Sequence, residues 1–162
     1  MKTPVRLLSF FLVFTISSPA QIMVEKNKLI EEFGPGYTTG TSDNGSDYLS
    51  YEKVEEGLLG DIILKTTLYY FIKYNDRIDV CSHVKLILPS SETPFYIFWL
   101  NDKMEYLGNL KWKDPESEYS YKMQIIEPFL ALTIWIDGEE VTETFKQTES
   151  FSKTYNLVPK KY

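Results

Sequence analysis

Residues 61–89 carry two long runs of alternating apolar and polar side chains. The even-numbered positions of residues 62–72 are mostly apolar and the odd-numbered ones more polar, and the same holds for residues 78–88. Side chains of a strand point to opposite faces in turn, so this period of two predicts two strands. Because both apolar sets are even-numbered, we expect a hairpin whose even-numbered face covers the core.

Charged residues indicate which turn joins the two strands. A two-residue loop would place even positions opposite odd ones and send one apolar face to water, whereas a three-residue loop keeps the faces aligned. A loop of residues 75–77 places Lys73 opposite Asp79, an opposite-charge pair worth about 0.2–1 kcal/mol, whereas a loop of residues 74–76 places Lys73 opposite Arg77. The charges favour the first loop. Its register also predicts the pairs Ile72 with Val80, Phe71 with Cys81, Tyr69 with His83 and Leu68 with Val84.

Residues 21–33 have the apolar spacing of a short amphipathic helix. Apolar side chains recur about one or two turns apart among mainly charged residues, and Gly34 and Pro35 stop the helix. The apolar positions are Ile22, Leu29, Ile30 and Phe33.

Further strands are expected along the rest of the chain. Asn44-Gly45 is a strong hairpin-turn signal. Residues 95–100 are continuously apolar, which is typical of a strand covered on both faces, and the polar segment 141–151 is typical of a guarded sheet edge. The expected strands are residues 48–54, 95–100, 104–112, 118–126, 129–136 and 141–151, with a short strand before the Asn-Gly turn.

These elements predict an α+β fold, in which a short N-terminal helix packs on a twisted antiparallel sheet. A β-sandwich and a small lipocalin-like barrel are the alternatives, although the early Gly-x-Trp signature of lipocalins is absent from the sequence.

The first part of the chain has the features of a signal peptide. Lys2 and Arg6 precede an apolar run at residues 7–16 that is too short to span a bilayer, and small residues follow at 18–20. We expect cleavage after Ala20 and export to the periplasm or the extracellular space. The expected division is a signal peptide at 1–20, a single β-rich domain at 21–158 and a C-terminal tail at 159–162.

The chain is acidic. Its formal net charge is −6, and removing Lys2 and Arg6 with the signal peptide lowers the charge to −8. Such a charge argues against a nucleic acid or an anionic membrane surface as partner. After the signal peptide no apolar segment is long enough to span a membrane.

Cys81 and His83 are the single cysteine and the single histidine of the chain. A lone cysteine excludes an internal disulfide, and we expect a half-buried small residue rather than a reactive thiol. Same-face neighbours on a strand lie about 6–7 Å apart, which is long for a nucleophile and its base, and His83 is expected to stack on Tyr69.

One histidine and one cysteine are too few ligands for a zinc site, and the segment with Asp43 and Asp47 lacks the closing glutamate of a calcium loop. We therefore expect no metal, no other cofactor and no catalytic set.

Two other classes of function stay open. Paired carboxylates could cleave glycosides, although Glu139, Glu140 and Glu143 are also explained by a solvated edge strand. A carrier of a small apolar ligand would need a closed cavity of about 300 Å³ or more.

Aromatic residues supply the candidates for binding, with 12 Tyr, 10 Phe and 3 Trp. Rows of exposed aromatic side chains can bind peptides or glycans, although core packing of a β-rich domain explains most of them equally well. The candidate binding residues are Tyr69, Phe71, Tyr96 and Trp135.

Short motifs along the mature chain carry a family resemblance. They are Leu29-Ile30-Glu31-Glu32-Phe33-Gly34, Asp43-Asn44-Gly45, Tyr48-Leu49-Ser50-Tyr51, Leu68-Tyr69-Tyr70-Phe71, Cys81, Trp112-Lys113-Asp114 and Tyr121. Together they resemble small exported proteins of unknown function from Bacteroidetes, a group with no assigned catalytic residues. The helix, its glycine-proline stop and the hairpin are similar to the repeat unit of β-lactamase-inhibitor-like and BamE-type envelope modules, which bind other proteins. The signal peptide, the lack of a catalytic set and the similarity to these modules together predict an exported, non-enzymatic domain that binds a protein or another ligand at the bacterial cell envelope.

Overall fold

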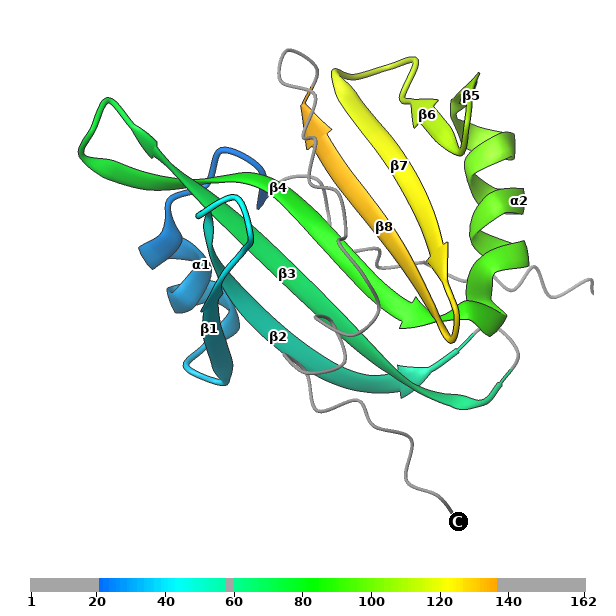
Figure 1. Cartoon of the computed structure of the whole chain (residues 1–162), viewed down its shortest axis with the longest axis horizontal. Coiled ribbons are helices and arrows are strands. Elements are labelled where there is room, and N and C mark those ends of the chain that lie inside the picture. Colours follow the sequence, from blue (N-terminus) through cyan, green and yellow to red (C-terminus); the bar gives the residue numbers. More distant parts are fainter. Residues whose placement is uncertain (1–20, 58–59, 137–162) are drawn as a thin grey trace, which may run out of the picture.

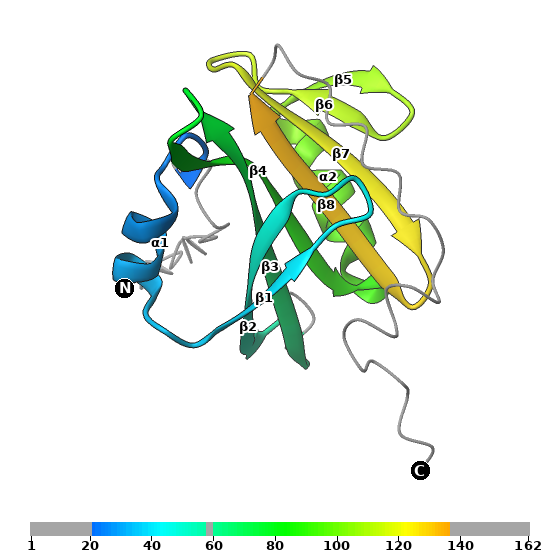
Figure 2. The same ribbon diagram turned by 60° about the vertical axis from the view of Figure 1, so that its left-hand side comes forward.

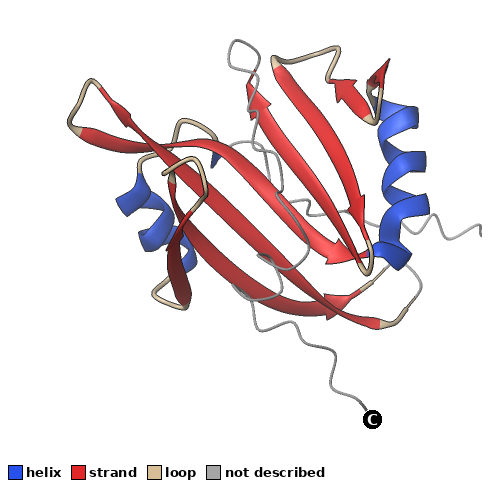
Figure 3. Ribbon diagram, viewed as in Figure 1, coloured by secondary structure: helices blue, strands red, loops and turns tan. Residues whose placement is uncertain are grey.

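The computed structural model describes residues 21–57 and 60–136, and these form an antiparallel sheet of eight strands with two α-helices (Figure 1). The α+β prediction is confirmed, with the sheet as the larger part (Figure 3). A 3₁₀ turn at Ser90–Glu92 leads into the second helix. In chain order the elements are α1 (Lys26–Phe33), β1 (Tyr37–Thr41), β2 (Asp47–Glu56), β3 (Ile62–Tyr74), β4 (Ile78–Pro89), α2 (Thr93–Lys103), β5 (Glu105–Gly108), β6 (Lys111–Lys113), β7 (Tyr119–Ile126) and β8 (Phe129–Ile136).

The strands lie in the order β1-β2-β3-β4-β8-β7-β6-β5, so β1 and β5 form the two edges of this sheet. The strand directions rotate between β2 and β7, which is the twist expected of an antiparallel sheet (Figures 1 and 2). Leu29 of α1 and Leu100 of α2 belong to one buried cluster with residues of β3, β4, β7 and β8, so both helices cover the same face. Neither α-helix in the described part of the chain has the length and apolar character needed to cross a membrane.

β3 and β4 form the expected hairpin, whose tip extends beyond the neighbouring strands (Figure 1). Asn75 and Asp76 in its three-residue turn have positive φ angles of 50° and 57°. Lys73 lies opposite Asp79, and Lys73 Nζ is 2.7 Å from Asp79 Oδ1, so the register predicted for the tip is confirmed. The pairs Ile72 with Val80 and Phe71 with Cys81 are also confirmed.

A β-bulge shifts the register deeper in this hairpin. Phe71 pairs with Cys81 but Tyr70 pairs with His83, which leaves Ser82 as an extra residue in β4. The two remaining sequence-based pairs are therefore wrong, because the extra residue moves β4 by one position. In the structure Tyr69 faces Val84 and Leu68 faces Lys85.

The larger core lies on the odd-numbered face of β3, and the prediction of an even-numbered core face is wrong for this strand. Ile63, Tyr69 and Phe71 join the large cluster beneath the helices, whereas Leu68 and Tyr70 belong to a second, smaller cluster. Both faces of β3 carry apolar residues, and the helices decide which face becomes the main core. On β4 the bulge changes the parity of the core-facing residues, which are Cys81, Val84, Leu86 and Leu88.

Residues 95–100, which were expected to be a strand, lie instead in helix α2. Pro94 occupies the first turn of the helix, where its missing N–H removes no helical hydrogen bond. An apolar run of this length is compatible with a strand or a buried helix, so periodicity could not separate the two. Leu100 is buried against the sheet, whereas Phe98 on the same helix is 75% exposed.

The single strand expected at 104–112 is a hairpin of β5 and β6, with positive φ angles at Gly108, Asn109 and Leu110 in its turn. The first helix is shorter than predicted, because Met23 and Val24 instead form backbone hydrogen bonds with Cys81 of β4. The other expected strands are confirmed as β1, β2, β7 and β8. The predictions at 1–20, 141–151 and 159–162 and the carboxylates Glu139, Glu140 and Glu143 lie outside the described residues.

Candidate functional site

The four aromatic residues predicted to bind a ligand do not share one exposed face. Tyr69 and Phe71 are buried in the large core, and the Tyr69 ring stacks on Phe33 at a centroid distance of 5.6 Å. Tyr96 of α2 is half-buried against the same core. Trp135 is buried on the opposite face, since it pairs with His83 while its neighbour Ile134 points into the large core.

Cys81 and His83 are both buried and point to opposite faces because of the bulge. Cys81 forms no disulfide, as expected, and burial raises the pKa of its thiol to about 12, which disfavours the reactive thiolate. The His83 ring stacks on Tyr70, not on Tyr69, at 4.3 Å between centroids, and its Nδ1 lies 2.9 Å from Ser82 Oγ. We interpret this imidazole as a packing residue of the sheet.

Tyr96 leads to a different group of residues at the end of the β2–β3 hairpin, which we call the hairpin-end site. Side chains there alternate between a charged face on the side of the helices and an apolar face on the other side. The charged face consists of Lys53, Glu55 and Lys65, with Glu92 and Tyr96 beside it, and the apolar face consists of Val54, Ile62 and Leu64.

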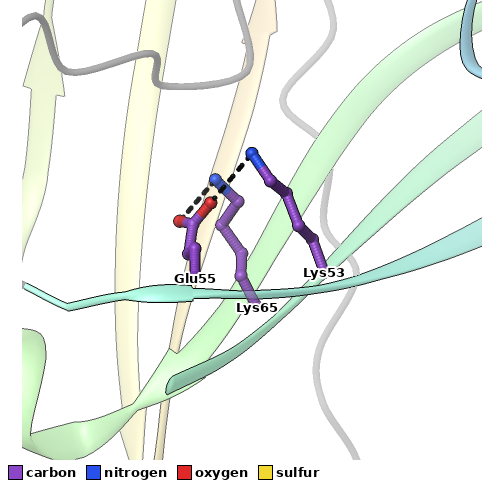
Figure 4. A network of polar contacts seen from close by, with 3 residues as sticks. All are labelled: Lys53, Glu55 and Lys65. Carbon is purple, nitrogen blue, oxygen red and sulfur yellow. Dashed lines mark ion pairs between the residues drawn. The ribbon is translucent and has the colours of Figure 1, made fainter. Parts of the chain in front are cut away.

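On the charged face, the Glu55 carboxylate joins two lysines. Lys53 and Lys65 face each other across β2 and β3, and the Glu55 carboxylate contacts both ammonium groups, one through each oxygen (Figure 4). Glu55 Oε1 is 2.7 Å from Lys65 Nζ, and Glu55 Oε2 is 3.4 Å from Lys53 Nζ. The Lys65 side chain is only 9% exposed, against 67% for Lys53. Glu55 therefore holds a nearly buried ammonium group in place.

The start of α2 packs closely against this network. Burial, followed by smaller effects of the negative charges on Glu55 and Glu92, raises the pKa of the Tyr96 phenol to about 12. Glu92 is buried, and a Cβ at Gly57 would lie 2.8 Å from its Oε1 and 2.9 Å from Ile63 Cγ2. The backbone directly after β2 can come this close to Glu92 because residue 57 has no side chain.

The perturbed phenol predicts a loss of stability at alkaline pH. The folded-state pKa of Tyr96 is about 12 and its unfolded value is about 10, so its contribution is complete below about pH 10 and is lost between about pH 10 and 12. Tyr121, whose pKa burial also raises to about 12, adds to the same fall. We expect Tyr96→Phe to make urea-derived unfolding free energies fall less steeply over this range. Tyr74→Phe, at a half-exposed ring, is the control, and an equal change in both variants would contradict the placement of Tyr96.

On the apolar face, three neighbouring side chains are exposed to solvent. Val54 lies opposite Leu64, and Ile62 is the next residue on the same side of β3. Val54 is 67% exposed and Ile62 is 74% exposed, with Leu64 at 38%. Exposed apolar residues are common singly, but a contiguous group beside a sheet edge is typical of a binding surface. Val54 has an exposed glutamate on either side along β2, Glu52 and Glu56.

Of the residues at this site, only Tyr96 was predicted from the sequence to take part in binding. Lys65 belongs to the odd-numbered face that was expected to be the more polar one, and Ile62 and Leu64 were assigned to the core. Two sequence signals could have indicated the site: Lys65 directly after the apolar run of residues 62–64, and the two glycines, Gly57 and Gly60, between the two strands. Among the described residues, no three His, Cys, Asp or Glu side chains are grouped so that they could hold a metal ion.

Comparison of the chain with protein-family models, with curated proteins and with solved structures finds no match.

Proposed function

We propose that this chain is an exported, non-enzymatic domain that binds a protein at the bacterial cell envelope through the hairpin-end site. The observation that carries the proposal is the contiguous exposure of Val54, Ile62 and Leu64 at the end of a sheet. Burial of such a patch by a partner is favourable at roughly 25 cal/mol per Å² of apolar surface. The signal-peptide features of residues 1–20 and the resemblance to envelope binding modules support the same proposal.

The charged face makes the apolar face a well-ordered surface for binding. Glu55 and Lys65 connect neighbouring strands, and Gly57 lies against Glu92 at the start of α2. A surface whose backbone is held in this way loses little conformational freedom when a partner binds. The site therefore combines exposed apolar area with a pre-organised backbone.

A photo-crosslinking amino acid at position 62 tests the proposal in the cells that make the protein. We expect a crosslinked adduct with a protein partner at position 62 and none at position 98, because Phe98 is exposed to the same extent, 75% against 74%, but lies on α2. Adding Val54→Lys should reduce the adduct at position 62 about tenfold or more, as loss of a central apolar contact does. An adduct at position 98 with none at position 62 would assign binding to α2 instead.

A further inference from the structure

Beside the apolar patch, the outer edge of β2 has backbone groups that no strand of the described part of the chain pairs with. Gly57 N–H donates to Asp61 O at 2.7 Å, and hydrogen-bonded pairs alternate along an antiparallel ladder. In β2 the odd-numbered residues therefore hydrogen-bond to β3, and the even-numbered residues direct N–H and C=O away from it. Ser42 N–H donates to Ser46 O at 2.8 Å, which gives the same parity on the β1 side.

β1 covers only half of this edge. Its pairing with β2 ends at Tyr37 opposite Tyr51. Glu52, Val54 and Glu56 continue the row of outward N–H and C=O groups, and within the described residues no strand pairs with them. An open row of this kind is a template for another strand. The open part of the β2 edge therefore begins where the pairing with β1 ends.

The side chains on this edge select the charge of the strand that can pair with it. Glu52, Val54 and Glu56 share one face, in the order acidic, apolar, acidic. Ile62 and Leu64 extend the apolar centre onto β3. Cross-strand partners of opposite charge are favourable and like charges directly opposite are unfavourable. A strand with a basic residue on each side of an apolar one matches all three positions.

A second copy of the chain fits this edge poorly. Only even-numbered residues direct hydrogen-bonding groups outward, so the symmetric pairing centred on Val54 places each Glu52 opposite Glu56 of the other copy. The same register places Lys53 opposite Glu55, but these two groups are already paired within each copy. The net charge on each chain, −6 in full and −8 without residues 1–20, opposes association further. The acidic edge thus discourages pairing with itself while it attracts a basic strand.

We propose that residues 52–56 bind an extended segment of a partner protein by strand addition, and that this segment alternates basic, apolar and basic residues. The segment runs antiparallel to β2, with its apolar residue opposite Val54 and a lysine or arginine opposite each of Glu52 and Glu56. Main-chain hydrogen bonds supply affinity and the alternate side chains supply specificity, as in other cases of strand addition. This inference rests on the proposed function, since it names the partner of the same site.

A synthetic peptide provides the probe. We expect a blocked Thr-Lys-Thr-Val-Thr-Lys-Thr peptide to shift the amide signals of Glu52, Val54 and Glu56 saturably in NMR titrations of the mature chain. The same peptide with glutamate in place of both lysines should have a dissociation constant at least about tenfold higher, because both charge pairs become repulsive. Absence of saturable binding of the basic peptide at millimolar concentration, or equal binding of the two peptides, would overturn strand addition.

Two variants test the backbone and the charges separately. Val54→Pro removes an outward N–H without removing a hydrogen bond to β3, and it should lose binding about tenfold or more, whereas Val54→Thr keeps the N–H and should bind. The double variant Glu52→Lys and Glu56→Lys should lose the basic peptide and bind the acidic one, with folding checked by circular dichroism. Equal binding by the proline and threonine variants would contradict strand addition.

Two further outcomes separate this inference from the function on which it rests. Dimerisation of the wild-type chain in sedimentation experiments that Val54→Pro abolishes would assign the edge to a second copy and overturn the basic segment. A partner that crosslinks to position 62 while the chain does not bind the basic peptide would leave the proposed function standing and overturn strand addition. If position 62 gives no crosslinked adduct and the chain does not bind the basic peptide either, the proposed function and strand addition are both overturned.

Discussion

Replacing Trp112 by alanine is expected to lower the free energy of unfolding by about 3–5 kcal/mol, measured by urea denaturation. Trp112 of β6 is almost fully buried in the large core and contacts the Tyr106 ring at 5.3 Å between centroids. Its Nε1 donates to Asn101 Oδ1 of α2 at 2.8 Å. The substitution therefore removes a large core side chain and a direct link between the sheet and a helix.

Asn101→Ala is the matched control for this prediction. It removes the acceptor of the indole hydrogen bond and leaves the ring in the core, so we expect a cost of about 0.5–1.5 kcal/mol. Trp112→Ala should therefore be the more damaging change by a clear margin. Equal costs for the two variants would mean that the indole contributes little packing, contrary to its position between β6 and α2.

The second large effect is expected at Glu55. Glu55→Gln removes the charge that pairs with Lys65 at 2.7 Å and leaves an ammonium group whose side chain is only 9% exposed. Breaking a fully buried ion pair costs about 3–5 kcal/mol, and because the Glu55 side chain is 25% exposed we expect about 2–3 kcal/mol here. The free energy of unfolding from urea or guanidinium titration measures this loss.

Two further variants determine whether the unpaired ammonium group of Lys65 causes the loss of unfolding free energy. Adding Lys65→Met to Glu55→Gln removes the unpaired ammonium, so the double variant should recover most of the stability. Lys53→Met removes the exposed partner of Glu55 and should cost less than about 1 kcal/mol. If the double variant is as unstable as the sum of its single changes, Lys65 and Glu55 do not form the coupled pair described here.

The sequence was a good guide wherever neighbours along the chain decide the structure. The β3–β4 turn follows from the charges of Lys73 and Asp79 and from the need to keep apolar faces aligned, and these interactions lie within a few residues of each other. The strands at β7 and β8 follow from uninterrupted alternation, and the first helix follows from its apolar spacing. Such signals are local, so they predict an element without knowledge of the residues that pack against it.

Prediction failed where an apolar segment could serve two structures. Residues 95–100 are as compatible with a buried strand as with α2, and in the structure they form a helix that packs against the large core. The bulge at Ser82 was equally hidden, because one extra residue leaves the alternation on each side intact. It reverses the parity of β4, and with it the partners of Tyr69 and Leu68.

The candidate site likewise depends on packing between segments that are far apart in the sequence. Tyr96 was selected for its aromatic ring; Glu92 lies in the turn directly before α2, but Glu55 comes from β2, far from Tyr96 in the sequence. Val54 and Ile62 could not be recognised as exposed before it was known which face of β3 the helices cover.

By itself, the sequence determined most of the described strands, the turn between β3 and β4 and the approximate place of the first helix, because hydrophobic period and short-range charge pairs act between near neighbours. Only the tertiary structure decided which face of β3 became the core, where the second helix lay and which edge of β2 stayed open. Those outcomes depend on burying apolar surface between segments far apart in the chain, and that free energy has no local signature in the order of residues.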